Sequence, residues 1–233
     1  MQKPKVVVLI FANTSAREIL NKSFTKNQKL FGYLNKKTIA TAKKSRAQLM
    51  FCDETLQKGK NFAEKFACDI DGVFKKGYQH IIAIGNHSPG LKTKHIAFII
   101  NALQKGHSVI GFSLDGGVYL IGITKKQFNK QEFLNLPWQT NLLLNCLEKA
   151  LFSKTFIVKK LEYLKDIDNY NDLKYFINNY SFSNSLKKLL VQLVSFSKNI
   201  FAKNTAKLLF YWTVFCFYNK GSPFSLYLFN NHT

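Results

Sequence analysis

The stretch His80-Ile81-Ile82-Ala83-Ile84-Gly85-Asn86-His87-Ser88-Pro89 decides the fold class of this chain. Its first half, His80–Ile84, is a continuous apolar run, as expected for a strand that is buried on both faces. Its second half, Gly85–Pro89, is a small polar loop, and a helix-like segment follows it. A polar loop between a buried strand and a helix is where α/β proteins bind ligands. The stretch therefore predicts an α/β fold with a candidate site at Gly85–Pro89.

The alternation of apolar strands and helical segments extends over most of the chain. Further strands are predicted at Val6–Phe11, Gln48–Cys52, Ser108–Phe112, Val118–Ile123 and Thr155–Val158. Helices are predicted over Thr25–Lys44, from Phe62 to a stop at Gly77, from a cap at Thr93 to a stop at Gly106, over Thr140–Phe152 and over Asn171–Asn179. This alternation predicts a mainly parallel sheet with helices on both faces, which is a three-layer α/β/α sandwich.

The residues after Tyr180 have a different pattern. Apolar positions recur there at helical spacing beside lysines, as in Leu186, Leu189, Leu190, Leu193, Val194 and Phe201 beside Lys187, Lys188, Lys198 and Lys203. We therefore predict one α/β domain over residues 1–180 and a basic, aromatic-rich helical extension over residues 181–233. The apolar face of the extension is expected to pack on the core or on a partner subunit. A basic amphipathic helix on a membrane surface is the alternative.

Charge narrows the classes of partner. The formal net charge is +21, which attracts nucleic acid, anionic lipid or phosphorylated ligands. Only Arg17 and Arg46 are arginines, and base edges are most often read by bidentate arginine. We therefore expect no nucleic-acid partner, and we favour contact of the C-terminal extension with an acidic membrane surface over it.

Cysteine usage and the N-terminus indicate the compartment. The four cysteines, Cys52, Cys68, Cys146 and Cys216, are widely spaced and form no CxxC pair, which is typical of reduced thiols in a cytoplasmic protein. The apolar run Val6–Phe11 is too short for the apolar part of a signal peptide. Nothing in the pattern indicates an oligomeric state.

Two loops contain residues that could carry chemistry. In Gly85–Pro89, His87 could be a metal ligand or a contact to phosphate, and the alternative is a surface histidine in an ordinary loop. In Asp115-Gly116-Gly117, the carboxylate could bind a sugar hydroxyl, bind a metal or act as a base. The alternative there is a hairpin-like turn, since Asp-Gly is a common turn signal.

A third cluster runs from Asp166 to Leu173. Asp168 or Asn169 is expected to cap a helix, with Asp172 in its first turn, where negative charge is favourable. Asp166 or Asp168 could also bind magnesium or manganese, which prefer carboxylate oxygen. Trp138 lies beside a helix start; we favour core packing for its ring over stacking on a sugar or base.

Taken in order, these segments resemble a bacterial family of arsenosugar-biosynthesis-type glycosyltransferases, formerly a domain of unknown function. Gln57-Lys58-Gly59 with Phe62-Ala63-Glu64-Lys65-Phe66 resembles the family pattern Q-x-G-x-x-[LF]-G-E-R-[MF]. Ile84–Pro89 resembles G-[SN]-D-[ST]-P, and Asp115–Gly122 resembles D-G-G-[YF]-Y-L-[IM]-G. Leu136–Thr140 resembles the W-[ST] segment, and Asp166–Leu173 resembles D-I-D-T-x-x-D-L. The ordered match covers roughly residues 5–180.

The resemblance implies the glycosyltransferase-A fold, which is the nucleotide-diphospho-sugar transferase architecture. It implies a glycosyltransferase that takes a sugar from a nucleotide-diphosphate donor, with Asp115 as the catalytic residue. The donor is expected on the first-strand loop and the two glycine loops, at Phe11, Ala12, Asn13, Gly85, Asn86, Ser88, Gly116 and Gly117. Manganese or magnesium is the implied cofactor, with His87 and Asp168 as its ligands. A nucleotidyltransferase of the same fold, or a binding protein that has lost turnover, is the alternative.

The chain departs from the family pattern in its phosphate-handling elements. His87 stands where the family has an aspartate, the expected counterpart of the acidic motif that holds a divalent metal on a nucleotide diphosphate. The first loop, Phe11–Ser23, offers Arg17 and Lys22 but no Gly-Lys-Thr-Arg run. The family's Glu-Arg becomes Glu64-Lys65, preceded by Ala63 instead of glycine. The resemblance therefore supports the fold more firmly than the activity.

Overall fold

The computed structural model describes residues 5–22, 28–113, 116–152, 157–179, 187–188 and 190–192. The chain divides into a unit that ends at Leu190 and a second unit that begins at Val191. The strands and helices named in this subsection all belong to the first unit. Of the predicted extension the structure describes residues 187–188 and 190–192, where Leu190 of the apolar stripe is buried, and the rest of the stripe lies outside the described residues. The boundary after residue 180 stays a prediction.

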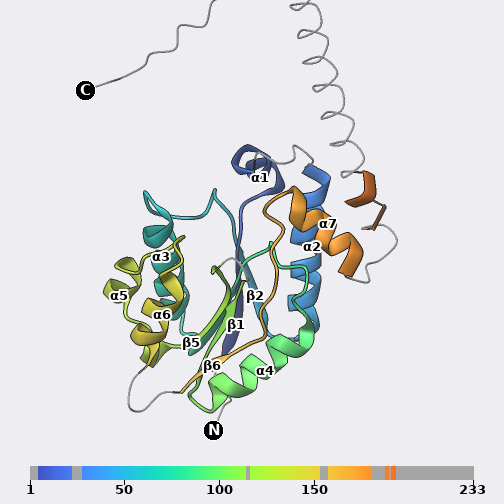
Figure 1. Ribbon diagram of the computed structural model, residues 1–233. Coiled ribbons are helices and arrows are strands. Elements are labelled where there is room, and N and C mark those ends of the chain that lie inside the picture. The colour runs from blue at the N-terminus through green and yellow to red at the C-terminus, as the bar shows by residue number, and fades with distance from the viewer. Residues whose placement is uncertain are drawn as a thin grey trace, which may run out of the picture. The chain divides into compact units, whose positions relative to one another are not determined.

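Six strands form one sheet in the order β2-β1-β3-β5-β4-β6 (Figure 1). They are β1 (Val6–Phe11), β2 (Gln48–Cys52), β3 (His80–Ile84), β4 (Ser108–Phe112), β5 (Val118–Thr124) and β6 (Val158–Lys160). The pairs β1–β2, β1–β3 and β4–β6 are parallel. β5 runs antiparallel to both of its neighbours. The prediction of a mostly parallel sheet is thus confirmed, with β5 as the reversed strand.

Helices cover both faces of the sheet (Figure 1). On one face α3 (Phe62–Lys75), α5 (Lys130–Leu134) and α6 (Leu143–Leu151) pack in one apolar cluster with Val7, Leu9 and other inward residues of the strands. On the other face α2 (Gln28–Lys44) and α4 (Thr93–Gln104) pack on Val8, Ile10 and their neighbours. Successive strand residues point to opposite faces, so a fully apolar strand such as β1 supplies both clusters. The three-layer α/β/α sandwich is confirmed.

Several element boundaries differ from the sequence-based expectation. α1 (Ser15–Asn21) and α5 were not predicted, nor was the short 3₁₀ helix η1 (Lys125–Gln127). α4 starts at Thr93 itself, so Lys92 holds the cap position. α6 begins at Leu143 instead of Thr140, since residues 138–142 form a turn in which Gln139 has a φ of 63°. β6 lies at Val158–Lys160, beyond most of the predicted Thr155–Val158, and α7 covers Tyr170–Asn179.

The topology gathers the polar loops at one edge of the sheet. The carboxyl ends of β1, β3 and β4 lie there, and so does the start of β5, because β5 is reversed. β4 and β5 are joined by the turn at residues 113–117, which is too short for a parallel crossover. Ser113 N donates to Gly117 O at 2.9 Å, and Gly116 N donates to Ser113 O at 3.1 Å. The hairpin-like turn that Asp-Gly indicates is therefore present, with Gly116 at a φ of 88°.

Candidate functional site

A cleft with a volume of about 790 Å³ opens at this edge of the sheet. It is lined by predicted site residues from three loops and from the segment after β6. These lining residues are Phe11, Ala12, Asn13, Gly85, Asn86, His87, Ser88, Gly116, Gly117 and Asp168. Asp115, the predicted catalytic residue, lies outside the described residues. The structure thus brings together the described members of the predicted site, while their roles remain predictions.

Glu18 lines the cleft from the unpredicted helix α1. Thr14 caps this helix by accepting from Arg17 N at 3.3 Å, and Thr14 N donates to Glu54 in the loop after β2 at 2.6 Å. The Glu18 side chain is only 2% exposed, and its Oε1 accepts from Asn13 Nδ2 at 3.0 Å. Burial alone would raise the pKa of Glu18, but His87, Asn13 and Lys22 lower it below its usual value. Glu18 is therefore a buried anion beside the loop after β1.

The imidazole of His87 lies between two carboxylates. Its Nε2 is 3.2 Å from Oε1 of Glu18, and its Nδ1 is 3.8 Å from Oδ1 of Asp168. The closer of the two contacts helps to hold the pKa of Glu18 below its usual value. The ring also packs edge-on against buried Phe31, with centroids 6.4 Å apart. His87 is therefore a fixed part of the cleft wall, and the alternative of a solvated surface histidine does not match these contacts.

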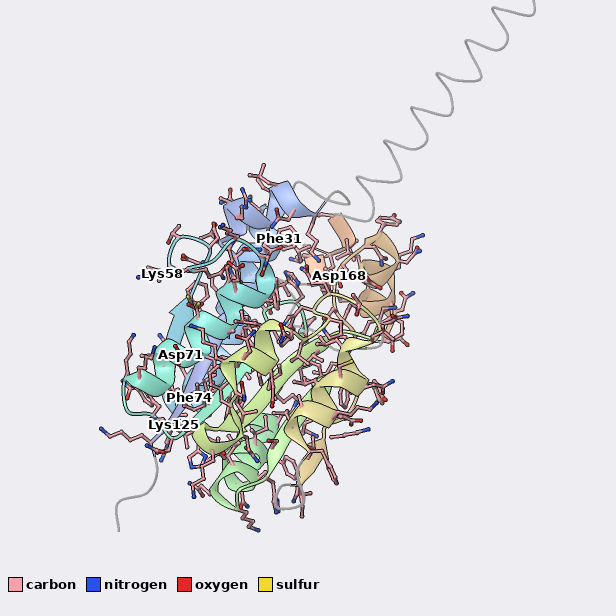
Figure 2. The ribbon with its side chains drawn as sticks, turned by 90° about the vertical axis from the view of Figure 1, so that its left-hand side faces the viewer. Phe31, Lys58, Asp71, Phe74, Lys125 and Asp168 are labelled. Carbon is pink, nitrogen blue, oxygen red and sulfur yellow. The ribbon has the colours of Figure 1, made fainter. Side chains whose placement is uncertain are left out.

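Asp168 forms an ion pair with Lys22, the residue at the C-terminal end of α1. The backbone N of Asp168 donates to Oδ2 of Asp172 at 3.1 Å, and Asp172 N donates to Oδ1 of Asn169 at 3.1 Å. The expectation that this cluster caps α7 is therefore confirmed, with Asn169 as the cap and Asp172 in the first turn. The same turn holds the Asp168 carboxylate toward the cleft. Figure 2 shows Asp168 at the end of the unit that also carries Phe31 and Lys58, with Lys125 toward the other end.

Asp166 is held by two serine hydroxyls, one from the loop after β3 and one from the end of β4. Ser88 Oγ donates to its Oδ1, and Ser113 Oγ donates to its Oδ2 at 2.8 Å. Burial raises the pKa of Asp166, and nearby Asp168 raises it further, while the two serine hydrogen bonds act in the opposite sense. Both carboxylate oxygens are thus engaged in joining the loops after β3 and β4 to the segment that follows β6. This is a positioning role for Asp166.

Aromatic rings form another part of the cleft wall. Trp138 packs on Phe62 and Phe66, with ring centroids 5.4 and 5.0 Å apart, and its Nε1 donates to Phe133 O at 2.7 Å. Phe11 packs edge-on against Phe66 at 5.1 Å. The predicted core packing of Trp138 is therefore confirmed. Trp138 also lines the cleft, so its ring has a face or edge within reach of a ligand.

Two more lysines line the cleft beside the start of α3. These are Lys60 and Lys65, and within the part of the chain that the structure describes neither side chain has an ion-pair partner. The loop before them depends on Gly59, which has a φ of 144° and where a Cβ would lie 2.6 Å from the Cβ of Glu64. The Gln57-Lys58-Gly59 motif therefore forms a backbone turn, and Lys60, which follows this turn, lines the cleft.

The cofactor implied by the resemblance is a divalent metal at His87 and Asp168. As arranged, the described residues do not fit one, because Asp168 is paired with Lys22, Asp166 with two hydroxyls and Glu18 with Asn13. Across the described ranges no three histidine, cysteine or acidic side chains converge as a metal site requires. Metal binding through His87 and Asp168 stays a prediction.

The sequence did not indicate that Glu18 and Ser113 contact the site, nor that Lys22 pairs with Asp168. Glu18 is a single acidic residue in a polar segment, and only the unpredicted helix α1 turns it inward. Ser113 and Lys22 act through contacts 53 and 146 residues distant along the chain. The one available signal was the position of Lys22 in the first-strand loop, where the family pattern has basic residues.

One family model matches this chain, over residues 33–140, and its description is "Uncharacterized protein conserved in bacteria (DUF2064)". The matched range contains the Gln57, Gly85 and Trp138 motifs. No curated protein matches the chain. Assignment to arsenosugar biosynthesis stays a prediction.

Solved structures match the fold over most of the chain. A protein of Desulfovibrio desulfuricans G20 assigned as a nucleotide-diphospho-sugar transferase superposes with a TM-score of 0.69 and 21% identity, covering 84% of this chain and 98% of that one. The chain therefore has the nucleotide-diphospho-sugar transferase fold. This likeness shows the fold alone.

Weaker matches include two further bacterial proteins. One is a 4-diphosphocytidyl-2C-methyl-D-erythritol synthase of Anaerococcus prevotii (TM-score 0.48, 12% identity, 75% and 97% covered). The other is a protein of Mycobacterium tuberculosis H37Rv in complex with manganese (TM-score 0.45, 11% identity, 76% and 100% covered). At these TM-scores the two likenesses support no inference about this chain.

No helix among the described residues is long and apolar enough to cross a membrane.

Proposed function

We propose that this chain is a glycosyltransferase that moves a sugar from a nucleoside diphosphate donor to an acceptor hydroxyl. The observation that supports it best is the lining of the cleft at the carboxyl edge of the sheet. Lys22, Lys60 and Lys65 line the cleft with ammonium groups, which suit a diphosphate. Trp138 and Phe62 line it with aromatic rings, which suit a flat base or a sugar face.

In the proposed reaction, an acceptor hydroxyl oxygen attacks the anomeric carbon of the donor. The bond from that carbon to the diphosphate oxygen breaks, and the nucleoside diphosphate leaves with the bonding electrons. The lysine ammonium groups stabilise the negative charge that develops on the leaving diphosphate. Asp115 is the proposed base that takes the hydroxyl proton. The backbone at Gly85, Gly116 and Gly117 leaves room for the donor.

A second candidate function is nucleotidyl transfer. The two carboxylates Asp166 and Asp168, which line the cleft together, favour it. This reaction would consume a nucleoside triphosphate and release pyrophosphate. A third candidate is a binding protein without turnover, which the engagement of Asp168 by Lys22 favours.

Calorimetry against a panel of nucleotide sugars and nucleoside triphosphates separates these candidates. Binding of a nucleotide sugar, followed by release of its nucleoside diphosphate when acceptor alcohols are added, supports sugar transfer. Pyrophosphate release from a triphosphate and a sugar phosphate supports nucleotidyl transfer instead. Donor binding without release of either product supports the binding protein, and a panel without any binding contradicts all three.

A further inference from the structure

We infer that the Lys22 ammonium takes the place of a divalent cation in this cleft, so that the chain binds a nucleoside diphosphate without metal. This inference rests on the proposed function for the identity of the ligand. Its structural basis is a row of four side chains from three parts of the chain. In order these are Glu18, His87, Asp168 and Lys22, each in contact with the next.

Lys22 is held in place beside the cleft. It follows the last turn of α1, and its backbone N donates to Glu18 O at 2.9 Å. Its side chain is 22% exposed and lines the cleft. One contact with Asp168 uses part of its capacity, since an ammonium group has three donors. The remaining donors are available to phosphate oxygens at the mouth of the cleft.

A metal ion could bind Asp168 only if the ion pair between Asp168 and Lys22 were broken. Its backbone is fixed by the capping turn of α7 through Asp172. The neighbouring Ile167 N donates to His87 O at 3.1 Å, which ties this turn to the loop after β3. A divalent ion at Asp168 would have to displace an ammonium group that already neutralises the carboxylate.

His87 makes this corner of the cleft less negative than the family pattern would. A carboxylate at this position would face Glu18 and Asp168 at close range, and three anions would attract a cation strongly. An imidazole at this position adds no negative charge, and it lies 3.2 Å from Glu18. His87 therefore removes the charge that would recruit a metal, while Lys22 supplies the positive charge that the metal would have brought. The two side chains therefore act together to let this corner of the cleft hold a diphosphate without a metal.

Manganese binding to the chain alone tests this inference without any nucleotide. The loss of the free Mn²⁺ signal in electron paramagnetic resonance measures bound metal in the wild-type chain, in the double variant Lys22→Ala/His87→Asp and in Lys125→Ala. We expect no binding up to millimolar metal in the wild type and in Lys125→Ala, whose lysine lies toward the other end of the unit (Figure 2). We expect one bound ion in the double variant. A thermal melt establishes that each variant is folded, and Lys22→Ala alone serves if the double variant is not.

Saturable binding of one Mn²⁺ by the wild type, abolished by Asp168→Asn, would overturn the inference. So would a folded double variant, or a folded Lys22→Ala chain in its place, that binds no more manganese than the wild type. Because these titrations contain no nucleotide, their outcome does not depend on whether the proposed function is right. Failure of every nucleotide to bind would remove the proposed function and leave the manganese result standing.

Discussion

Nε2 of His87 lies 3.2 Å from Oε1 of Glu18, a carboxylate that is only 2% exposed. This pair joins α1 to the loop after β3 in the lining of the cleft. A buried anion is stable only beside groups that compensate its charge, and Asn13, Lys22 and His87 do so here. Because the two side chains are packed together and also line the cleft, the pair contributes both to the stability of the fold and to the shape of the cleft.

Replacement of Glu18 by alanine should destabilise the chain. The change leaves the Asn13 amide and one side of the His87 ring without their buried partner, which typically costs about 1–3 kcal/mol. Glu18→Gln should cost less, because the amide oxygen can still accept from Asn13 Nδ2. Urea unfolding of both variants measures the difference. Equal stability of wild type and Glu18→Ala would show that the buried carboxylate contributes nothing.

Trp138 should be more important for stability than a surface aromatic residue. It touches Phe62, Phe66 and Phe133 and donates to a backbone carbonyl. Trp138→Ala should lower the free energy of unfolding by about 2–4 kcal/mol, slightly less than truncation of a fully buried ring costs, because Trp138 is only partly buried. Trp138→Phe should cost less, since it keeps a ring but loses the Nε1 donor. If Trp138→Ala and Trp138→Phe were equally stable, this result would contradict the packing of the ring.

Protonation of buried His80 should destabilise the chain at mildly acidic pH. Burial lowers the pKa of His80 below its usual value of 6.5, and its Nδ1 has no hydrogen-bond partner within the described residues. The unfolded chain then binds a proton more readily than the folded chain, so stability is lost as pH falls below about 6.5. Unfolding measured at pH 7.5 and pH 5.5 should show a smaller loss in His80→Gln than in the wild type. A loss of the same size in both would remove this explanation.

Cys52 should react slowly with alkylating reagents. Burial and the hydrogen bond to Asp69, 2.8 Å away, together raise the pKa of its thiol to about 12. Asp69→Asn removes the negative charge, so alkylation of Cys52 by iodoacetamide at pH 8 should become several-fold faster. Asp71→Asn is the matched control, because Asp71 lies on the same helix and pairs with Lys75 and Lys130. Mass spectrometry of the modified peptide gives the rate, which should not change in the control.

Four strands were predictable from sequence together with their bounds, because each is a short, largely apolar run with a sharp end. Val6–Phe11, Gln48–Cys52, His80–Ile84 and Ser108–Phe112 begin and end where the pattern places them. The direction of β5 was less accessible, since it depends on the short turn at residues 113–117 rather than on the apolar pattern of Val118–Thr124.

The site was predictable only as a set of loops. Gly85–Ser88 and Gly116-Gly117 line the cleft as expected because strand ends on one edge must meet. Glu18 could not be found, because the turn of α1 buries it and its segment is polar. The pairing of Lys22 with Asp168 joins residues 146 positions apart, and no local pattern indicates such a contact.

Calorimetric titration of the wild-type chain with a panel of nucleotide sugars, in excess chelator and again with manganese, tests the proposed metal-free donor cleft most directly. At least one donor should bind with the same dissociation constant in both conditions. Lys22→Ala should weaken that binding roughly ten- to hundredfold, as expected for a charged hydrogen bond, and Lys125→Ala should leave it unchanged. Binding that requires manganese, or no binding of any donor in either condition, would contradict the proposal.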